Sequence, residues 1–183
     1  MWRGRKVARA RRHCQQIIEW NVASPELVAS CEALIHEADS LNVGQRAPSF
    51  CVKDLRGDTV GLAYYRGKVL VLHFWAPSCG PCGAIYPHLR KIAHDYPRDA
   101  VSLVGVSQDT DVEAVRSRAM EEGLTWPQIC EGSGGKDRLS GLYNVMGIPA
   151  IYVLDGSGQI AAKLVGEKSG AELERAVRAL VDH

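Results

Sequence analysis

The sequence has no strong excess of charge of either sign and no long hydrophobic run. Its 22 lysine and arginine residues nearly balance 21 aspartate and glutamate residues, and the formal net charge is +1 at neutral pH. This balance gives no reason to expect a nucleic-acid partner. No stretch approaches the roughly 20 apolar residues of a membrane-spanning helix, so we expect no membrane span in this chain.

The chain also lacks a recognisable secretory signal. Basic residues crowd the first twelve positions, but polar residues such as His13, Gln15 and Glu19 interrupt what should be an apolar segment after them. We therefore expect a cytoplasmic protein, with an extracytoplasmic location as the alternative if a further segment precedes this one. We interpret the basic cluster itself as a solvated terminus.

The six cysteines do not have the spacing of a disulfide-rich scaffold or of a structural zinc site. Small secreted scaffolds show dense, regular cysteine spacing, and a structural zinc site needs a second pair of ligands. A hydrophobic content of 46% is enough for a core without disulfides. We interpret four of the cysteines as inert core side chains: Cys14, Cys31, Cys51 and Cys130.

Residues 1–43 are predicted to form a basic helical extension. Ser24 followed by Pro25 is typical of a helix start. Apolar residues then recur at steps of three and four, which predicts one apolar face that must be covered by the main domain or by a partner. The residues of that face are Leu27, Cys31, Leu34, Ile35, Ala38 and Leu41.

Residues 44–183 alternate between strand-like and helix-like segments. The apolar runs at 69–75 and 101–107 predict strands that are covered on both faces. Helices are expected over residues 80–96, with a kink at Pro87, and over 111–122, 136–143 and 171–181. A hairpin is expected over 150–165. This order predicts an α/β fold with a mixed central sheet flanked by helices.

The segment Cys79-Gly80-Pro81-Cys82 follows a predicted strand and opens a predicted helix. Partial positive charge at a helix N-terminus stabilises a thiolate, which is the attacking species in disulfide exchange. The spacing lets one helical turn bring the two sulfurs together, so that Cys82 can attack a mixed disulfide held on Cys79. An isolated Cys-x-x-Cys is equally half of a zinc site, but this structural context favours a redox dithiol.

Together with the downstream segment Gly147-Ile148-Pro149-Ala150, this motif resembles the thioredoxin superfamily. Other segments of residues 44–183 resemble its TlpA/ResA-type branch. The resemblance implies a thioredoxin-like fold, with Cys79 as the attacking thiol and Cys82 as the resolving thiol. It also implies that Pro149 is a cis proline and that the backbone of Ile148 pairs with extended substrate.

The resemblance further implies what the protein acts on. We expect protein thiols and disulfides as partners, an electron donor that the sequence does not identify, and no cofactor. The Gly80-Pro81 dipeptide matches thioredoxin, so we expect a disulfide reductase in which these two residues contact the substrate. Trp75 is expected to lie beside the thiols and to contribute to substrate binding.

Three positions depart from the pattern of the family. Ser78 stands where the family often has tryptophan, and Ile85 stands where many TlpA/ResA-type proteins carry glutamate. His73 stands where thioredoxins have a buried aspartate. We interpret His73 as a catalytic candidate, either as a base for the proton of Cys82 or as an imidazolium that favours thiolate. The alternative is a strand histidine satisfied by a local hydrogen bond.

Two other functions are weighed against the oxidoreductase. A peroxiredoxin needs proline and threonine seven and three residues before its peroxidatic cysteine. Before Cys79 these positions hold Leu72 and Ala76, and before Cys82 they hold Trp75 and Cys79, so a peroxidase is less favoured. A scaffold or carrier module that binds a soft metal through Cys79 and Cys82 is the third hypothesis.

Overall fold

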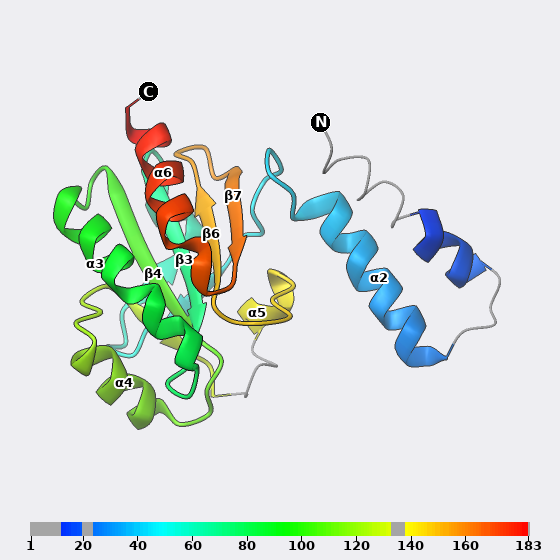
Figure 1. Ribbon diagram of the computed structural model, residues 1–183, viewed down its shortest axis with the longest axis horizontal. Coiled ribbons are helices and arrows are strands. Elements are labelled where there is room, and N and C mark those ends of the chain that lie inside the picture. The colour runs from blue at the N-terminus through cyan, green and yellow to red at the C-terminus, as the bar shows by residue number, and fades with distance from the viewer. Residues whose placement is uncertain (1–11, 20–23, 133–137, 183) are drawn as a thin grey trace.

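The computed structural model describes residues 12–19, 24–132 and 138–182 (Figure 1). Residues 12–19 form a short helix ahead of the labelled elements. The helices are α2 (Pro25–Ser40), α3 (Tyr86–Asp95), α4 (Val112–Glu121), α5 (Arg138–Leu142) and α6 (Gly170–Val181). The strands are β1 (Cys51–Lys53), β2 (Thr59–Gly61), β3 (Val69–Trp75), β4 (Val101–Ser107), β5 (Gln128–Cys130), β6 (Ala150–Leu154) and β7 (Ile160–Val165). Three short 3₁₀ helices are η1 (Leu62–Tyr65), η2 (Gly80–Ala84) and η3 (Glu167–Ser169).

Five of these strands form one mixed sheet in the order β5-β4-β3-β6-β7. β3 lies at the centre, parallel to β4 on one side and antiparallel to β6 on the other. β1 and β2 pair only with each other, as a small antiparallel ribbon. The helices α3 and α6 cover the face of the sheet that is turned toward the viewer in Figure 1. The predicted thioredoxin-like fold with a mixed central sheet is confirmed.

The central strand β3 is buried along its whole length, as its apolar run predicts. Side chains alternate between the two faces of a strand. Val71 and Trp75 therefore point into the core that contains Leu89 of α3 and Val177 of α6. The alternate residues of β3 point into a second core on the other face, with Leu41, Phe50 and Tyr143; they are Leu70, Leu72 and Phe74. Side chains thus cover both faces of β3, and this packing fixes the position of the strand's carboxyl end.

The N-terminal extension is attached to this unit at its C-terminal end. Leu41 is fully buried in the second core. The Gly44 N–H donates to the Ile160 carbonyl over 2.8 Å, and the Ile160 N–H donates to the Gln45 carbonyl over 2.8 Å. The chain therefore joins the start of β7 immediately after α2.

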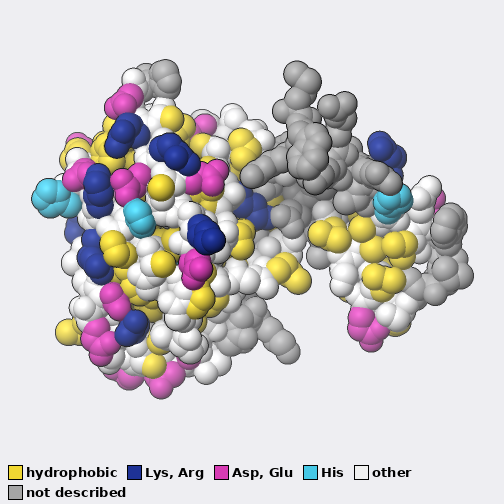
Figure 2. Space-filling view, in the orientation of Figure 1, with side chains coloured by type: hydrophobic (Ala, Val, Ile, Leu, Met, Phe, Trp, Pro, Cys, Tyr) yellow, Lys and Arg dark blue, Asp and Glu magenta, His cyan; other side chains and the backbone are white. Residues whose placement is uncertain are grey.

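The predicted apolar face of α2 is only partly covered. Cys31 is buried, whereas Leu27 and Leu34 are about half exposed. Figure 2 shows hydrophobic side chains gathered on the N-terminal helices, at the right of the view. The side chain of Ala38 and the basic residues of positions 1–11 lie outside the described part of the chain.

The expected single helix over residues 80–96 is wrong in one respect. The structure divides it into η2 and α3, and Pro87 lies in the first turn of α3. Proline needs no hydrogen-bond acceptor for its nitrogen in a first turn, so it begins a helix there without kinking one. Within the described ranges, every helix is too short or too polar to cross a membrane.

Candidate active site

Cys79 and Cys82 lie just beyond the carboxyl end of the central strand. β3 ends at Trp75, and Cys79 occupies the N-cap position of η2, which leads through Ile85 into α3. The two cysteines form a disulfide, with their Cα atoms 5.4 Å apart. Because the helical start at Cys79 carries partial positive charge, it stabilises the thiolate that forms there on reduction.

The two sulfurs differ in exposure. Cys82 is fully buried, whereas Cys79 is half-buried. Gly80 and Pro81, between them, are exposed. A polypeptide that approaches the site therefore reaches the sulfur of Cys79 and the backbone of the intervening dipeptide, but it does not reach Cys82. Cys79 thus has the exposure expected of an attacking thiol, and Cys82 has the burial expected of a resolving thiol.

The floor of the site consists of aromatic and aliphatic side chains. Trp75, Ile85 and Tyr86 are fully buried in the core that contains Cys82. The rings of Trp75 and Tyr86 meet edge to face, with centroids 6.0 Å apart. Burial raises the pKa of Tyr86 to about 12, so its phenol is uncharged at neutral pH. The glutamate that many TlpA/ResA-type proteins carry is thus replaced by a buried hydrocarbon side chain at Ile85.

Trp75 is held by a residue that the sequence analysis did not identify. Its indole N–H donates to Oε1 of Gln128 over 3.1 Å, and Nε2 of Gln128 donates to the Trp126 carbonyl over 3.1 Å. Trp75 has no exposed surface, and its contribution to substrate binding stays a prediction. Its side chain supports the site from below.

His73 is buried on the same face of β3. Its ring stacks parallel to Trp75 at a centroid distance of 6.5 Å and meets Tyr86 edge to face at 5.9 Å. Neither ring nitrogen has a hydrogen-bond partner among the residues that the structure describes. Burial lowers the pKa of His73 to about 3. The ring is therefore neutral at neutral pH, so it does not supply the positive charge of the imidazolium interpretation.

Strand pairing brings the distant proline segment to the start of the cysteine motif. Phe74 lies opposite Ala150 in the antiparallel pair of β3 and β6, so the next residue of β3 lies beside Pro149. The Ile148–Pro149 peptide is cis, as the resemblance implies. Ile148 and Cys79 both pack against the core that contains Cys82. The two motifs are thus neighbours although about 70 residues separate them in the sequence.

Exposed apolar side chains flank this proline segment. Met146 lies just before it, and Val165 lies at the end of the neighbouring strand β7. The Gly166 N–H donates to the Pro149 carbonyl over 2.9 Å, which joins the end of β7 to the segment. An extended polypeptide that contacts Ile148 would meet these apolar surfaces on the way.

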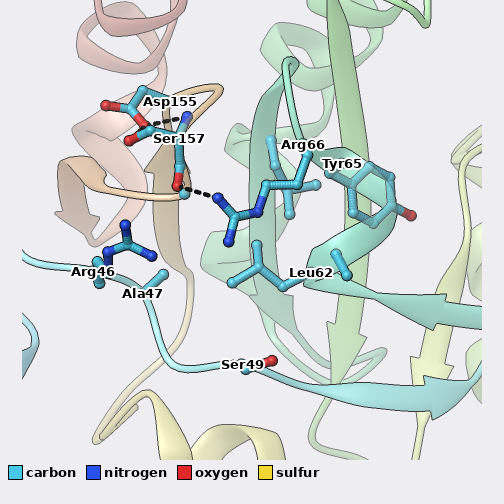
Figure 3. A pocket seen from close by; sticks show the side chains of 11 residues that line it. Arg46, Ala47, Ser49, Leu62, Tyr65, Arg66, Asp155 and Ser157 are labelled. Atoms are coloured by element: carbon cyan, nitrogen blue, oxygen red, sulfur yellow. Dashed lines mark hydrogen bonds between the residues drawn. The ribbon is translucent and has the colours of Figure 1, made fainter.

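A separate cavity of about 250 Å³ lies near the other end of β3, where Leu70 contributes to its wall (Figure 3). Arg66 extends across it and donates to the Ser157 carbonyl over 3.4 Å. The Asp155 carboxylate already accepts hydrogen bonds from Ser157 and Gln159. This arrangement stabilises the turn between β6 and β7, and none of the residues that line the cavity is a cysteine.

Comparison with known proteins gives one consistent family. The model of the AhpC/TSA family matches residues 43–163. The chain is 34% identical to the thioredoxin-like protein YneN of Bacillus subtilis over 135 residues, which cover 72% of this chain and 76% of YneN. It is 26% identical to the thiol-disulfide oxidoreductase ResA of Bacillus anthracis over 138 residues, 75% of this chain and 78% of ResA.

Solved structures agree with these relatives. The thioredoxin domain of a thiol-disulfide oxidoreductase from Bacteroides vulgatus superposes with a TM-score of 0.69 at 28% identity, covering 78% of this chain and 99% of that domain. A secreted disulfide oxidoreductase of Mycobacterium tuberculosis, homologous to DsbE of E. coli, gives a TM-score of 0.62 at 29% identity, with coverage of 72% and 96%. The chain therefore belongs to the AhpC/TSA family, as a thioredoxin-like redox enzyme similar to the ResA thiol-disulfide oxidoreductases.

Proposed function

We propose that the protein reduces disulfides in other polypeptides through the Cys79–Cys82 dithiol. The observation that carries this proposal is the unequal exposure of the two sulfurs at the end of β3, with Cys79 half-buried and Cys82 fully buried. The Gly80-Pro81 dipeptide and its likeness to thioredoxin support the reductive direction. The relatives named as thiol-disulfide oxidoreductases support the reaction class.

The reaction has two exchange steps. The thiolate of Cys79 attacks one sulfur of the substrate disulfide, and the other substrate sulfur leaves with the electron pair of the broken bond. Cys82 then attacks the sulfur of Cys79 in the mixed disulfide, and the second substrate sulfur leaves. The substrate gains two electrons, and Cys79–Cys82 becomes a disulfide. A dithiol donor must return it to the reduced form.

Residues around the sulfurs have separate parts in this proposal. Exposed Gly80 and Pro81 and the backbone of Ile148 contact the extended substrate, and Pro149 faces the cysteines. His73 stays a prediction as the acceptor of the Cys82 proton, and its low pKa makes the neutral ring a weak base there. The location also stays a prediction: the sequence favours the cytoplasm, whereas the secreted relative favours the extracytoplasmic alternative.

The test combines a reduction potential with a trapping experiment. We expect a potential below about −220 mV and loss of insulin reduction by at least about 1,000-fold in Cys79→Ser. Cys82→Ser should accumulate a mixed disulfide on Cys79. Cys51→Ser is the matched control, because Cys51 is exposed on β1 and lies outside the site. A potential near −120 mV would contradict the reductive direction.

Two further measurements test the alternative functions. The AhpC/TSA match makes a peroxidase worth testing, and turnover of hydrogen peroxide by Cys79 at a rate above that of insulin reduction would support it. Among the described residues, no cluster of three or more metal-ligating side chains occurs. Retention of a soft metal by Cys79 and Cys82 through a chelator wash, without any disulfide forming, would favour the carrier function instead.

A further inference from the structure

A second pair of cysteines meets in the N-terminal extension. Cys14 lies in the helix of residues 12–19, Cys31 lies in α2, and the two side chains form a hydrogen bond. Cys14 is 6% exposed and Cys31 is 2% exposed. Both are free thiols. The other two cysteines outside the active site differ, because Cys51 is exposed on β1 and the Cys130 thiol donates to the Asp109 carbonyl.

Within the described residues, the two thiols belong to a small unit of two helices. α2 has 16 residues, just above the length of about 12–15 residues below which isolated helices are marginal in water. The helix of residues 12–19 lies beside α2, to one side of the sheet (Figure 1). Since Leu27 and Leu34 on α2 are half exposed, the main unit does not cover this helix along its length. Local opening of the pair therefore costs little free energy.

The closed pair is protected from chance oxidation. Burial, together with the hydrogen bond and charge of Cys31, raises the pKa of the Cys14 thiol above its ordinary value. A protonated thiol does not attack disulfides. Attack on another disulfide therefore requires the two helices to separate first. The sulfurs of Cys14 and Cys31 are neighbours when the helices are together, so a disulfide can then join them.

We propose that Cys14 and Cys31 form a reversible disulfide by exchange with the Cys79–Cys82 disulfide of this protein. The inference rests on the proposed oxidoreductase function, which supplies the oxidant. A thiolate of the opened pair attacks Sγ of Cys79, the Cys79–Cys82 bond breaks, and Cys82 leaves with its electron pair. The second cysteine of the pair attacks the first, and Cys79 leaves as a thiolate.

Atoms and electrons balance in this exchange. Cys14 and Cys31 together lose two electrons and form one sulfur–sulfur bond. Cys79 and Cys82 together gain two electrons, and their sulfur–sulfur bond breaks. The two protons released by Cys14 and Cys31 end on Cys79 and Cys82. The product disulfide closes the chain from residue 14 to residue 31 and ties the two helices together, so the stability of the extension depends on the redox state of the active site.

The experiment uses the full chain in a Cys51→Ser/Cys130→Ser background. Reduced protein is exposed to glutathione disulfide, quenched with acid, alkylated and digested, and the peptide linked through Cys14 and Cys31 is followed by mass spectrometry. The comparison protein also carries Cys79→Ser/Cys82→Ser. We expect the link to form at least about ten times faster when the active-site cysteines are present. No link at any glutathione ratio, or equal rates in the two proteins, overturns the inference.

A second readout measures the consequence for the fold. Amide exchange over residues 25–40 should slow by about 100-fold in the oxidised protein relative to the reduced protein, because the disulfide closes a loop of this size. Cys14→Ser is the matched control and should show no redox-dependent change. Unchanged exchange in the oxidised parent would contradict the proposed fastening of the helices.

Insulin reduction by Cys14→Ser/Cys31→Ser separates this inference from the proposed function. Normal insulin reduction by that variant, with no link in the parent, would reject the Cys14–Cys31 disulfide and leave the proposed reductase intact. A parent that forms the link but does not reduce insulin would reject the reductase and support only the second thiol pair.

Discussion

The indole N–H of Trp75 and Oε1 of Gln128 form a buried hydrogen bond of 3.1 Å beneath the active site. Gly105 on β4 is the residue that leaves room for it. A Cβ atom at position 105 would lie 1.9 Å from the same Oε1 and 2.7 Å from Cδ of Gln128. A glycine in the middle of a strand weakens the strand unless close approach requires it, and here the approach of Gln128 requires it.

Gly105→Ala should therefore destabilise the protein by about 2 kcal/mol. Displacement of Gln128 leaves the buried indole N–H of Trp75 without its acceptor, and a buried unsatisfied donor costs about 1–3 kcal/mol. Urea unfolding followed by tryptophan fluorescence measures the change. Gly141→Ala is the matched control: nothing lies within 4 Å of its Cβ position in α5, so we expect a neutral or stabilising effect. Equal losses in both variants would contradict this account.

His73 should make stability depend on pH in the mildly acidic range. Its pKa is about 3 in the folded protein, against an ordinary value of 6.5. A pKa depressed by folding contributes stability that is present above 6.5 and is lost as pH falls toward 3. Between pH 7 and pH 5 the native protein should lose about 2 kcal/mol more than His73→Leu does.

The comparison of the native protein with His73→Leu contains its own control. Carboxylates titrate equally in both, so the difference between their urea midpoints isolates the histidine. Because both ring nitrogens of His73 lack partners within the described ranges, His73→Leu should also be at least as stable as the native protein at pH 7. Parallel pH profiles for the two proteins would show that the ring is solvated in solution.

Met146→Asp should weaken the binding of polypeptide substrates. Met146 is 85% exposed beside the Ile148–Pro149 segment, and a charge there disfavours contact with apolar side chains of an extended chain. We expect KM for an unfolded protein disulfide to rise about tenfold, which corresponds to about 1.4 kcal/mol of lost contact.

The comparison for this prediction is Met120→Asp. Met120 is 78% exposed on α4, remote from the proline segment in the sheet order. It should leave KM unchanged, and both variants should react normally with a small disulfide such as oxidised glutathione. A similar rise of KM in Met120→Asp would mean that a general effect of charge, and no specific surface, is being measured.

Leu41→Ala should destabilise the thioredoxin-like unit although the residue lies at the end of the extension. Leu41 is fully buried in the second core, and truncation of a buried leucine costs about 2–5 kcal/mol. Leu34→Ala on the same stripe should cost less than about 0.5 kcal/mol, because Leu34 is half exposed. Thermal or urea unfolding of both variants tests this. A small effect of Leu41→Ala would mean that residues 1–43 are independent of the unit.

Local patterns predicted most of the sheet and the dithiol. The apolar run of β3 and the cysteine motif after it are contiguous in sequence, so periodicity and spacing are sufficient to predict them. β5 was not predicted because its three residues follow Pro127 and begin with a polar side chain, Gln128. Its pairing with β4 is a tertiary contact that no local pattern encodes.

The contacts beneath and beside the site were less predictable. The bond between Trp75 and Gln128 joins residues 53 positions apart. The neutral state of His73 depends on complete burial, which the side chains of other elements impose. The meeting of Cys14 and Cys31 depends on how two helices fold back on each other. The apolar step pattern identified Cys31 as inward-facing, but it did not indicate which residue it would meet.

The exposed dipeptide between the cysteines separates the chemistry of the site from the stability of the fold. A Cβ at Gly80 would touch nothing within 4 Å, and Pro81 contributes nothing to either core. Substitutions at these two positions should alter the balance between thiols and disulfide with little effect on folding. The redox balance of the site can thus be adjusted at two surface positions without repacking the buried sheet.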